Sequence, residues 1–587
     1  MRYFSVFSIL FLLLSCEKKI EDKIAEYPTP FEKSNGNQTA NYEDVIEFYI
    51  QLAKEFPEIN IQTIGETDSG NPLHIVTFNV DADFNFAKIG KDKTIILINN
   101  GIHPGESDGI DATMNLFRDL AVEKITPPKN TVITTIPVYN IDGALNRNST
   151  TRVNQNGPEI YGFRGNAQNY DLNRDFIKSD TKNAKTFADI FHLVKPDIFI
   201  DNHVSNGADY QYTLTHLFTQ HNKLGGDLGR YLDQELRPKL EQSLADSKWN
   251  ITPYVNVHNE VPENGFSQFM DSPRYSTGYT TLWNTLGMMV ETHMLKPYKK
   301  RVQGTYQLMA KMIEIADADT KKIKELRERA FSDQLEMDHY PLQWEVDSTK
   351  VSTLNFKGFE ADTLISEVTG LPRLKYDRNR PFTKKIAYKD NFKPAVIVEV
   401  PKAYIIKKGW SKIVELLDKN QINYQKLQQD TTFLVESYKI ATYNTYDRPY
   451  EGHYPHYGTT ITKKSDTVRF SQGDFWVPTN QPGMRYLLET LEPEAPDSFF
   501  NWNFFDAILS RKEGFSPYVF EDVALKMLRE NEALNLEFKL KKEMEPDFAS
   551  NWYAQLDWLY THSKYYEAAH MQYPVYRILK DSGLTAK

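Results

Sequence analysis

Residues that could bind a metal ion stand at two points of the chain, each next to an apolar run. His103 and Glu106 are three residues apart on a Pro-Gly turn after one such run, and His203 closes another. Zinc accepts imidazole nitrogens and carboxylate oxygens, and catalytic zinc sites use three protein ligands and leave a position for water. One His-Glu pair at this spacing is expected by chance in a chain with 13 histidines. The prediction of a metal site therefore depends on His203 as the third ligand.

Other polar residues stand where further apolar runs end. Asp171, Asn173 and Arg174 belong to an Asp-Leu-Asn-Arg sequence after a Gly-rich stretch, and an Asn-Ile-Asp-Gly sequence occupies 140–143. Glu291 is the single carboxylate inside an apolar, strand-like run. A carboxylate on one face of a buried strand costs free energy unless it is paired or functional. These residues alone leave both a salt bridge and a catalytic role open for Glu291.

The elements that must position these residues alternate between strand and helix patterns from about residue 40 to 330. Strands that alternate with longer helices are typical of an α/β fold, whose sheet binds ligands beyond the carboxyl ends of its strands. We therefore predict a mixed, mostly parallel sheet flanked by helices. The expected strands are Leu73–Val80, Thr94–Ile102, Val132–Ile141, Asp197–Val204 and Gly287–Met294, and the expected helices are Tyr42–Phe56, Ser107–Glu123, Thr181–Val194, Leu224–Ala245 and Val302–Ala330.

The chain from residue 336 onward has a different pattern. Short β-rich runs come first, with one βαβ-like stretch at Ala403–Leu427, and a helical tail is expected from Met484. We predict a boundary near residue 335, followed by a β-rich and then helical region of the α+β class.

Composition excludes several classes of protein. The chain has 587 residues, of which 40% are apolar and 25% are charged, as in an ordinary folded protein. Its formal charge of −10 gives no basic surface for nucleic acid. One cysteine excludes both an intrachain disulfide framework and a zinc site made of several cysteines.

The N-terminus has the pattern of an export signal. A basic residue precedes the apolar run Tyr3–Leu14, which is too short to span a bilayer. The Leu-Leu-Ser-Cys ending at Cys16 resembles a bacterial lipobox, in which the cysteine becomes the lipidated first residue. An ordinary signal peptide with an incidental cysteine is the alternative. We expect an exported protein of the cell envelope, lipid-anchored at Cys16 and facing the periplasm or the cell surface.

Taken together, the motifs resemble the M14 family of zinc carboxypeptidases. The order His-Pro-Gly-Glu, Asn-x-Asp-Gly, Asp-Leu-Asn-Arg, Asp-x-His and a late strand Glu is the order of that family, and it covers about residues 40–330. The resemblance implies one zinc ion per chain, held by His103, Glu106 and His203. It also implies that Glu291 serves as the general base, taking the proton of the attacking water and passing it to the leaving amine.

The resemblance assigns further residues to the substrate. Asp171 is expected to orient His103 through its second ring nitrogen, and Asn173 and Arg174 are expected to bind the terminal carboxylate. A tyrosine closes over the substrate in this family. Tyr275 and Tyr279 are both candidates whose spacing does not decide between them, and we take Tyr279 as the substrate-binding residue.

An arginine is expected to stabilise the negative charge that hydrolysis places on the carbonyl oxygen. In one branch of the family this arginine stands about nine residues before the Asn of the Asp-x-Asn-Arg motif, which is the position of Arg164. The longer spacing of another branch falls on Asn156, which cannot serve. We therefore expect Arg164 to be catalytic, with Arg152 as the alternative.

The predicted organisation has four parts. Residues 1–15 are a lipoprotein signal peptide, 16–39 a tether, 40–335 a zinc carboxypeptidase-like catalytic domain, and 336–587 an accessory region. The predicted function is hydrolysis of C-terminal peptide bonds by a metal-activated water. Two alternatives are a zinc amidase acting on cell-wall peptides or N-acyl amino acids, and a non-catalytic lipoprotein that binds peptide or glycan. The expected partners are a peptide substrate and a membrane, without nucleic acid.

Overall fold

A computed structural model describes residues 23–580, and an eight-stranded sheet forms its centre. The strands lie in the order β1-β2-β4-β3-β5-β9-β6-β7. The four central strands are mutually parallel, whereas β2 and β6 run antiparallel to them, so the predicted mixed, mostly parallel sheet is confirmed. The strands are β1 (Ile59–Glu66), β2 (Pro72–Phe78), β3 (Thr94–Asn99), β4 (Thr131–Ile136), β5 (Ile198–Ser205), β6 (Leu214–Phe218), β7 (Ile251–Pro253) and β9 (Leu286–His293).

Both faces of this sheet are buried, as the unbroken apolar runs predict. In β3, Ile95 and Leu97 pack into one hydrophobic cluster, and Ile96 and Ile98 pack into another on the opposite face. Alternate side chains of a strand point to opposite faces, so a strand covered on both sides must be apolar throughout. The helices that surround the sheet are α3 (Tyr42–Glu55), α5 (Asp108–Ala121), α7 (Lys182–Val194), α9 (Gly226–Tyr231), α10 (Arg237–Asp246) and α12 (Tyr298–Leu335).

One expected strand is shorter than its apolar run. The run Val132–Ile141 is a strand only to Ile136, where β4 ends and Pro137 follows. Proline has no backbone N–H for a sheet hydrogen bond. Asn140 then caps the short helix α6 (Ile141–Leu145), because its side-chain oxygen accepts the N–H of Gly143 at 2.9 Å. The polar residues at 140–143 therefore begin a helix.

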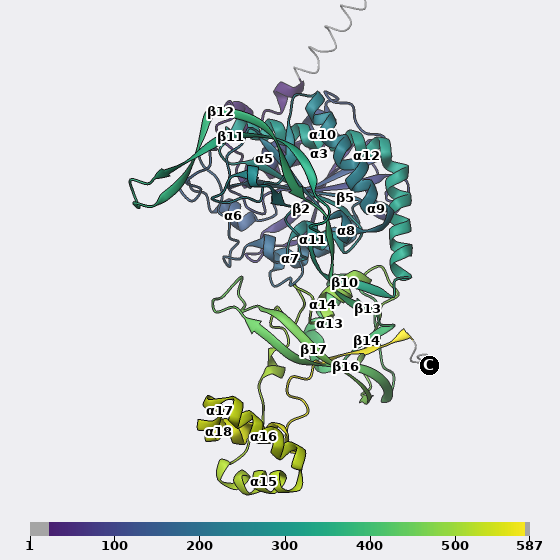
Figure 1. The fold of residues 1–587 in the computed structure, drawn as a ribbon. Helices are drawn as coiled ribbons and strands as arrows, with labels where there is room; N and C mark the ends of the chain where they lie inside the picture. The colour runs from purple at the N-terminus through teal and green to yellow at the C-terminus, as the bar shows by residue number, and fades with distance from the viewer. Residues whose placement is uncertain (1–22, 581–587) are drawn as a thin grey trace, which may run out of the picture.

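The long helix α12 ends at Leu335, and the chain beyond it first returns to the region that is built on this sheet. The hairpin of β11 (Ser352–Ile365) and β12 (Pro372–Lys389) joins that region through β8 (Phe266–Ser267), which pairs with β12. Figure 1 shows this hairpin projecting from the upper body. Strands β10 (His339–Val346) and β13 (Phe392–Glu399) form a separate pair below it.

The rest of the C-terminal region is built on a second, six-stranded sheet in the order β15-β18-β14-β19-β16-β17. The βαβ-like stretch is present as β14, α13 and β15, with β18 between the two strands. The bounds are β14 (Ala403–Ile406), α13 (Ser411–Lys419), β15 (Gln425–Lys426), β16 (Thr431–Thr445), β17 (His456–Phe470), β18 (Phe475–Pro478), α14 (Met484–Leu491) and β19 (Val575–Ile578).

The expected helical tail is an insertion in this sheet. Four helices with their own small hydrophobic core form a separate unit at the bottom of Figure 1, after which β19 returns to pair with β14 and β16. They are α15 (Pro517–Glu530), α16 (Glu532–Met544), α17 (Pro546–Ser550) and α18 (Trp552–Thr561). Across residues 23–580, no helix has both the length and the apolar character needed to cross a membrane. Cys16 lies outside the described residues.

Candidate active site

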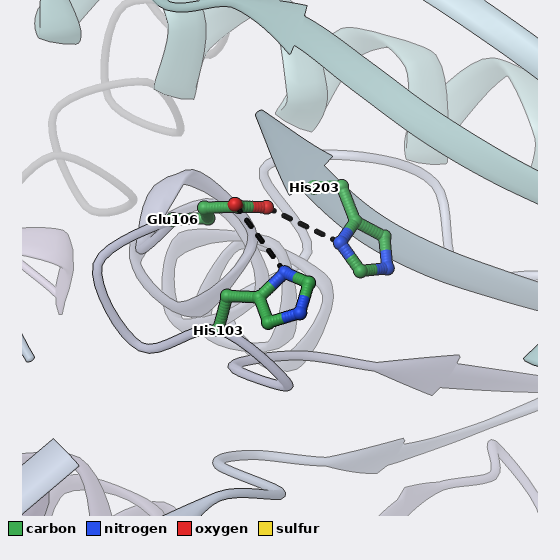
Figure 2. Close-up of side chains that lie close together, drawn as sticks. All are labelled: His103, Glu106 and His203. Carbon is green, nitrogen blue, oxygen red and sulfur yellow. Dashed lines mark hydrogen bonds and ion pairs between the residues drawn. The ribbon is translucent and has the colours of Figure 1, made fainter. Parts of the chain in front are cut away.

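Three side chains converge at the carboxyl ends of the central strands. One ligand atom from each of His103, Glu106 and His203 lies within 4.8 Å of the other two. Figure 2 shows both imidazole rings presenting Nδ1 to the Glu106 carboxylate, at 3.3 Å from His103 and 3.2 Å from His203. All three residues are buried. Two imidazole nitrogens and a carboxylate oxygen around one point match a zinc ligand set with an open fourth position.

Adjacent parallel strands place these residues together. His103 follows the end of β3, and His203 lies near the end of its neighbour β5. Between His103 and Glu106 the chain turns tightly, with the Glu106 N–H donating to the His103 carbonyl at 2.7 Å. A Cβ atom at Gly105 would lie 2.6 Å from Arg152 Cδ and 3.0 Å from the Gly162 carbonyl oxygen, so glycine allows both to pack closely on this turn.

A carboxylate orients each imidazole through its other nitrogen. His103 Nε2 lies 2.8 Å from Asp171 Oδ1, and His203 Nε2 lies 2.9 Å from Asp201 Oδ2. Partners of this kind fix which ring nitrogen faces a metal, here Nδ1. Asp171 thus contacts the His103 nitrogen that faces away from Glu106, and its orienting role stays a prediction. Asp201 was not predicted, although its signal was present, since residues two apart on a strand share a face.

The donor atoms of this cluster fit a metal ion. His103 Nδ1 is buried and, apart from the 3.3 Å ion-pair contact with Glu106, has no hydrogen-bond partner within residues 23–580. A buried polar atom of this kind costs free energy unless a ligand satisfies it. Burial opposes ionisation of Glu106, but His103 and Arg152 nevertheless hold the pKa of its carboxyl well below the ordinary value. The donor set is therefore one anionic oxygen and two oriented imidazoles, which suits zinc.

Glu291 lies beside this cluster on the next strand. In the register of β5 and β9 it is directly opposite His203, and it lines the same cavity. Burial raises the pKa of Glu291 to about 8, with Glu106 and Asp201 adding to the rise and His203 opposing it. A nearby cation would lower that pKa again. A carboxyl group tuned toward neutral pH is suited to accepting and returning a proton.

Both candidate arginines line the cavity, and they differ in their carboxylate contacts and in their exposure. Arg164 donates two hydrogen bonds to Asp171 Oδ2, at 3.0 and 2.8 Å, and its side chain is 43% exposed. Arg152 is more buried, with 14% of its side chain exposed, and lies 3.0 Å from Glu106. The catalytic role of Arg164 stays a prediction, and Arg152 is equally well placed to act on a substrate at the cluster.

Asn173 and Arg174 lie on a short 3-10 turn (Leu172–Arg174) at the cavity wall. The Asn173 side-chain oxygen accepts the N–H of Ser276 at 3.3 Å. The Arg174 guanidinium stacks 4.6 Å from the centre of the Tyr275 ring. Stacking leaves the edge of a guanidinium available for a carboxylate.

The prediction that Tyr279 contacts the substrate is wrong, because Tyr279 does not reach the cavity. Tyr279 is 1% exposed within the core, where its ring packs against Phe191 and its hydroxyl donates to Asn420 Oδ1 at 2.6 Å. Tyr275, at the start of α11 (Ser276–Thr281), is the tyrosine that lines the cavity. Tyr275 precedes the helix with an extended backbone (φ −89°, ψ 155°), and of the two tyrosines only Tyr275 lies on the cavity side.

The cavity has a volume of about 520 Å³, and both polar and apolar side chains line it. Leu217, Phe269 and Met289 supply apolar surface. Asp271 also lines it, and its buried Oδ2 has no hydrogen-bond partner among the described residues. Burial raises the pKa of Asp271 to about 6, although the positive charge of Lys223 opposes the rise. Sequence reasoning missed Asp271, because nothing in its neighbourhood marks it as buried.

Comparison with known proteins gives one family and several distant relatives. Residues 45–203 match the profile of the zinc carboxypeptidase family. Carboxypeptidase 2 of Trichophyton rubrum is 22% identical over 440 residues, which span 69% of this chain and 73% of that protein. Solved structures that align include a metallo-carboxypeptidase from Burkholderia cenocepacia (15% identity, 48% of this chain and 69% of that chain, TM-score 0.35). Another is the carboxypeptidase A of Helicoverpa armigera (14% identity, 53% and 82%, TM-score 0.36).

Proposed function

We propose that this chain, which is a zinc carboxypeptidase-like protein, removes residues from the free carboxyl ends of peptides. The observation that supports this most is the content of one cavity. It holds a three-residue metal ligand set, a carboxyl group with a raised pKa on the adjacent strand, and a stacked arginine.

His103, Glu106 and His203 would hold zinc, which supplies a Lewis acid that polarises the scissile carbonyl and acidifies the attacking water. Glu291 accepts the proton of that water and delivers it to the leaving amine. Arg164 or Arg152 lies against the negative charge that develops on the carbonyl oxygen.

The substrate end is selected by Arg174. Its guanidinium is held against Tyr275, and a planar guanidinium binds a carboxylate through two parallel hydrogen bonds. A substrate carboxylate bound there places the last peptide bond, and no other, near the metal ligands. This arrangement favours an exopeptidase over an amidase that acts within a chain.

The metal requirement can be tested directly. Purified chain should contain about one zinc ion, lose hydrolysis of a mixed peptide pool in a chelator, and recover it when zinc is returned. His103→Ala and His203→Ala should each lose most of the zinc. As a matched control, His258→Ala changes a histidine that lines the same cavity outside the ligand cluster, and it should retain zinc. Full zinc occupancy in both ligand variants would remove the assignment.

We also propose that the chain is exported and anchored through a lipid on Cys16, on the lipobox-like sequence that precedes it. Cys16→Ala should abolish lipid labelling in a bacterial host and release the protein from the membrane fraction. Continued partitioning of the variant with membranes would mean that another segment holds it there.

A further inference from the structure

The turn that bears Arg174 contacts a loop nearly three hundred residues later in the chain. This loop, residues 446–455, joins β16 to β17 in the C-terminal region, and we call it the 450 loop. Its tip is a tight turn in which Tyr450 and His453 exchange backbone hydrogen bonds. Glu451 and Gly452 both have positive φ, at 48° and 77°, as a type I′ turn requires.

The tip of the 450 loop packs against the residue before Asp171. A Cβ atom at Gly452 would lie 2.3 Å from the hydroxyl of Tyr170, so glycine is required both for the turn and for the close approach. His453 adds a contact beside it, with Nε2 2.7 Å from Asp180 Oδ2. The loop is therefore seated on the segment that carries the predicted substrate residues.

Two side chains at the tip reach the active-site turn itself. Arg174 Nε donates to the Tyr450 hydroxyl at 2.9 Å, and the Asp171 N–H donates to Glu451 Oε2 at 2.8 Å. Arg174 Nη1 donates to the Asn173 carbonyl at 2.8 Å. Nη2 makes no hydrogen bond to any residue in 23–580. The protein thus uses one N–H of Nε and one of Nη1, which leaves the second N–H of Nη1 and both of Nη2 for a carboxylate.

A second contact supports the other side of the same arginine. Arg274 precedes Tyr275, on whose ring Arg174 stacks. Asp497 of the C-terminal region is fully buried, and it accepts hydrogen bonds from the Arg274 N–H at 3.0 Å and from Arg274 Nε at 2.7 Å. Residues beyond 336 therefore contact Arg174 directly through Tyr450 and support the residue next to Tyr275. Asn173 and Asp171 hold Nη1 of Arg174 from its own turn.

We propose that Tyr450 and Glu451 are positioning residues, through which the C-terminal region holds Arg174 and the Asp171 backbone in the geometry that binds a substrate carboxylate. The proposal rests on the carboxylate-binding role given to Arg174 above. An arginine side chain free to rotate loses rotamer entropy when it binds, and one already held in place does not. Tyr450 therefore acts on affinity for the free carboxylate through Arg174, without contacting a metal ligand.

The test measures binding without turnover. In the zinc-loaded full-length Glu291→Gln chain, affinities are measured by calorimetry for N-acetyl-Gly-Phe and N-acetyl-Gly-Lys, each as the free acid and as the C-terminal amide. Adding Tyr450→Phe should weaken binding of the acids about tenfold, the scale of one hydrogen bond to a charged group. Binding of the amides and the zinc content should not change.

Two comparisons separate positioning from loss of loop structure. Tyr454→Phe changes a half-exposed tyrosine of the same loop whose hydroxyl makes no hydrogen bond to any described residue, and it should leave acid binding unchanged. Glu451→Ala should weaken acid binding, whereas Glu451→Gln should restore most of it, because the amide oxygen can still accept the Asp171 N–H.

Three results would overturn the proposal. Acid binding within twofold of the parent in Tyr450→Phe, or an equal loss in Tyr454→Phe, would refute the positioning role while leaving the carboxylate site intact. A parent chain that binds acids no better than amides would refute the carboxylate role of Arg174, and the positioning proposal with it.

Discussion

The two halves of the active site are held in different ways. The metal half, made by His103, Glu106 and His203, lies on neighbouring parallel strands of one sheet and has its orienting carboxylates close by. The proposed substrate half, made by Arg174 and Tyr275, lies on loops that the C-terminal region contacts. The hydrogen bonds that cross to the 450 loop join residues 276 and 280 positions apart.

Because of this difference, substitutions can impair one half of the active site and leave the other intact. Strands covered on both faces are fixed by the main core, whereas loops take their conformation from whatever packs against them. The halves meet at Asp171, whose side chain contacts His103 and Arg164 while its backbone N–H is held by Glu451. Changes in the metal half should remove chemistry, and changes in the substrate half should remove affinity.

The largest expected effect tests the chemistry of the metal half. Glu291→Gln keeps the shape of the side chain but cannot take a proton, so kcat should fall by roughly 10²–10⁴ or more. Zinc content and substrate binding should persist, as measured by elemental analysis and calorimetry. Turnover within threefold of the parent would remove Glu291 from the mechanism.

The next effect tests whether the C-terminal region holds the substrate half. Asp497→Asn leaves the Arg274 charge buried without its partner, and breaking a buried pair costs about 3–5 kcal/mol. The free energy of unfolding in urea should fall by this amount, and the KM for peptides should rise. Asp466→Asn removes an exposed pair with Lys464 and should change stability by less than about 0.5 kcal/mol. An equal free energy of unfolding in the two variants would show that the contact between Asp497 and Arg274 does not stabilise the fold.

Arg174 itself should affect affinity more than chemistry. Arg174→Ala should lower kcat/KM by roughly 10², mainly through KM, because a desolvated charge pair with the substrate is lost. Arg174→Lys keeps the charge but not the planar group, so its kcat/KM should lie between that of the parent and that of Arg174→Ala. A loss expressed wholly in kcat, with KM unchanged, would contradict the separation of the two halves.

The smallest effect concerns Asp271 in the cavity wall. Its folded-state pKa of about 6 exceeds the ordinary 3.8, so the folded chain keeps a proton that the unfolded chain releases. The resulting stability is fully present below pH 3.8 and is lost as the pH rises through about 6. Asp271→Asn cannot lose this proton, so its melting temperature relative to the parent should rise by a few degrees between pH 4 and 7. Parallel pH profiles of the two chains would contradict the raised pKa.

The sequence was most informative where the determinants are local. An apolar run, a Pro-Gly turn and the ends of two strands were enough to bring His103, Glu106 and His203 together, because parallel neighbours end at the same edge of a sheet. The orienting role of Asp201 could also have been predicted from its place two residues before His203 on a strand.

Long-range packing explains what could not be predicted. Tyr275 and Tyr279 have similar neighbours in the sequence, but Tyr279 lies in the core, where its hydroxyl donates to Asn420, the residue after α13 in the C-terminal region. Nothing near Tyr450 or Asp497 indicates a role in an active site, since each acts only through the docking of the C-terminal region. The return of the chain to the second sheet at β19 was missed for the same reason, as four residues are too few for a reliable strand pattern.

Product analysis of one matched peptide pair tests the central claim most directly. Peptides of mixed sequence, each as the free acid and as the C-terminal amide, are incubated with zinc-loaded chain, and the products are identified by mass spectrometry. We predict that single residues are released from the carboxyl end of the free acids, that the amides stay intact, and that a chelator stops the release. Cleavage of acids and amides alike, or cuts at internal bonds, would contradict a site in which Arg174 selects the terminal carboxylate.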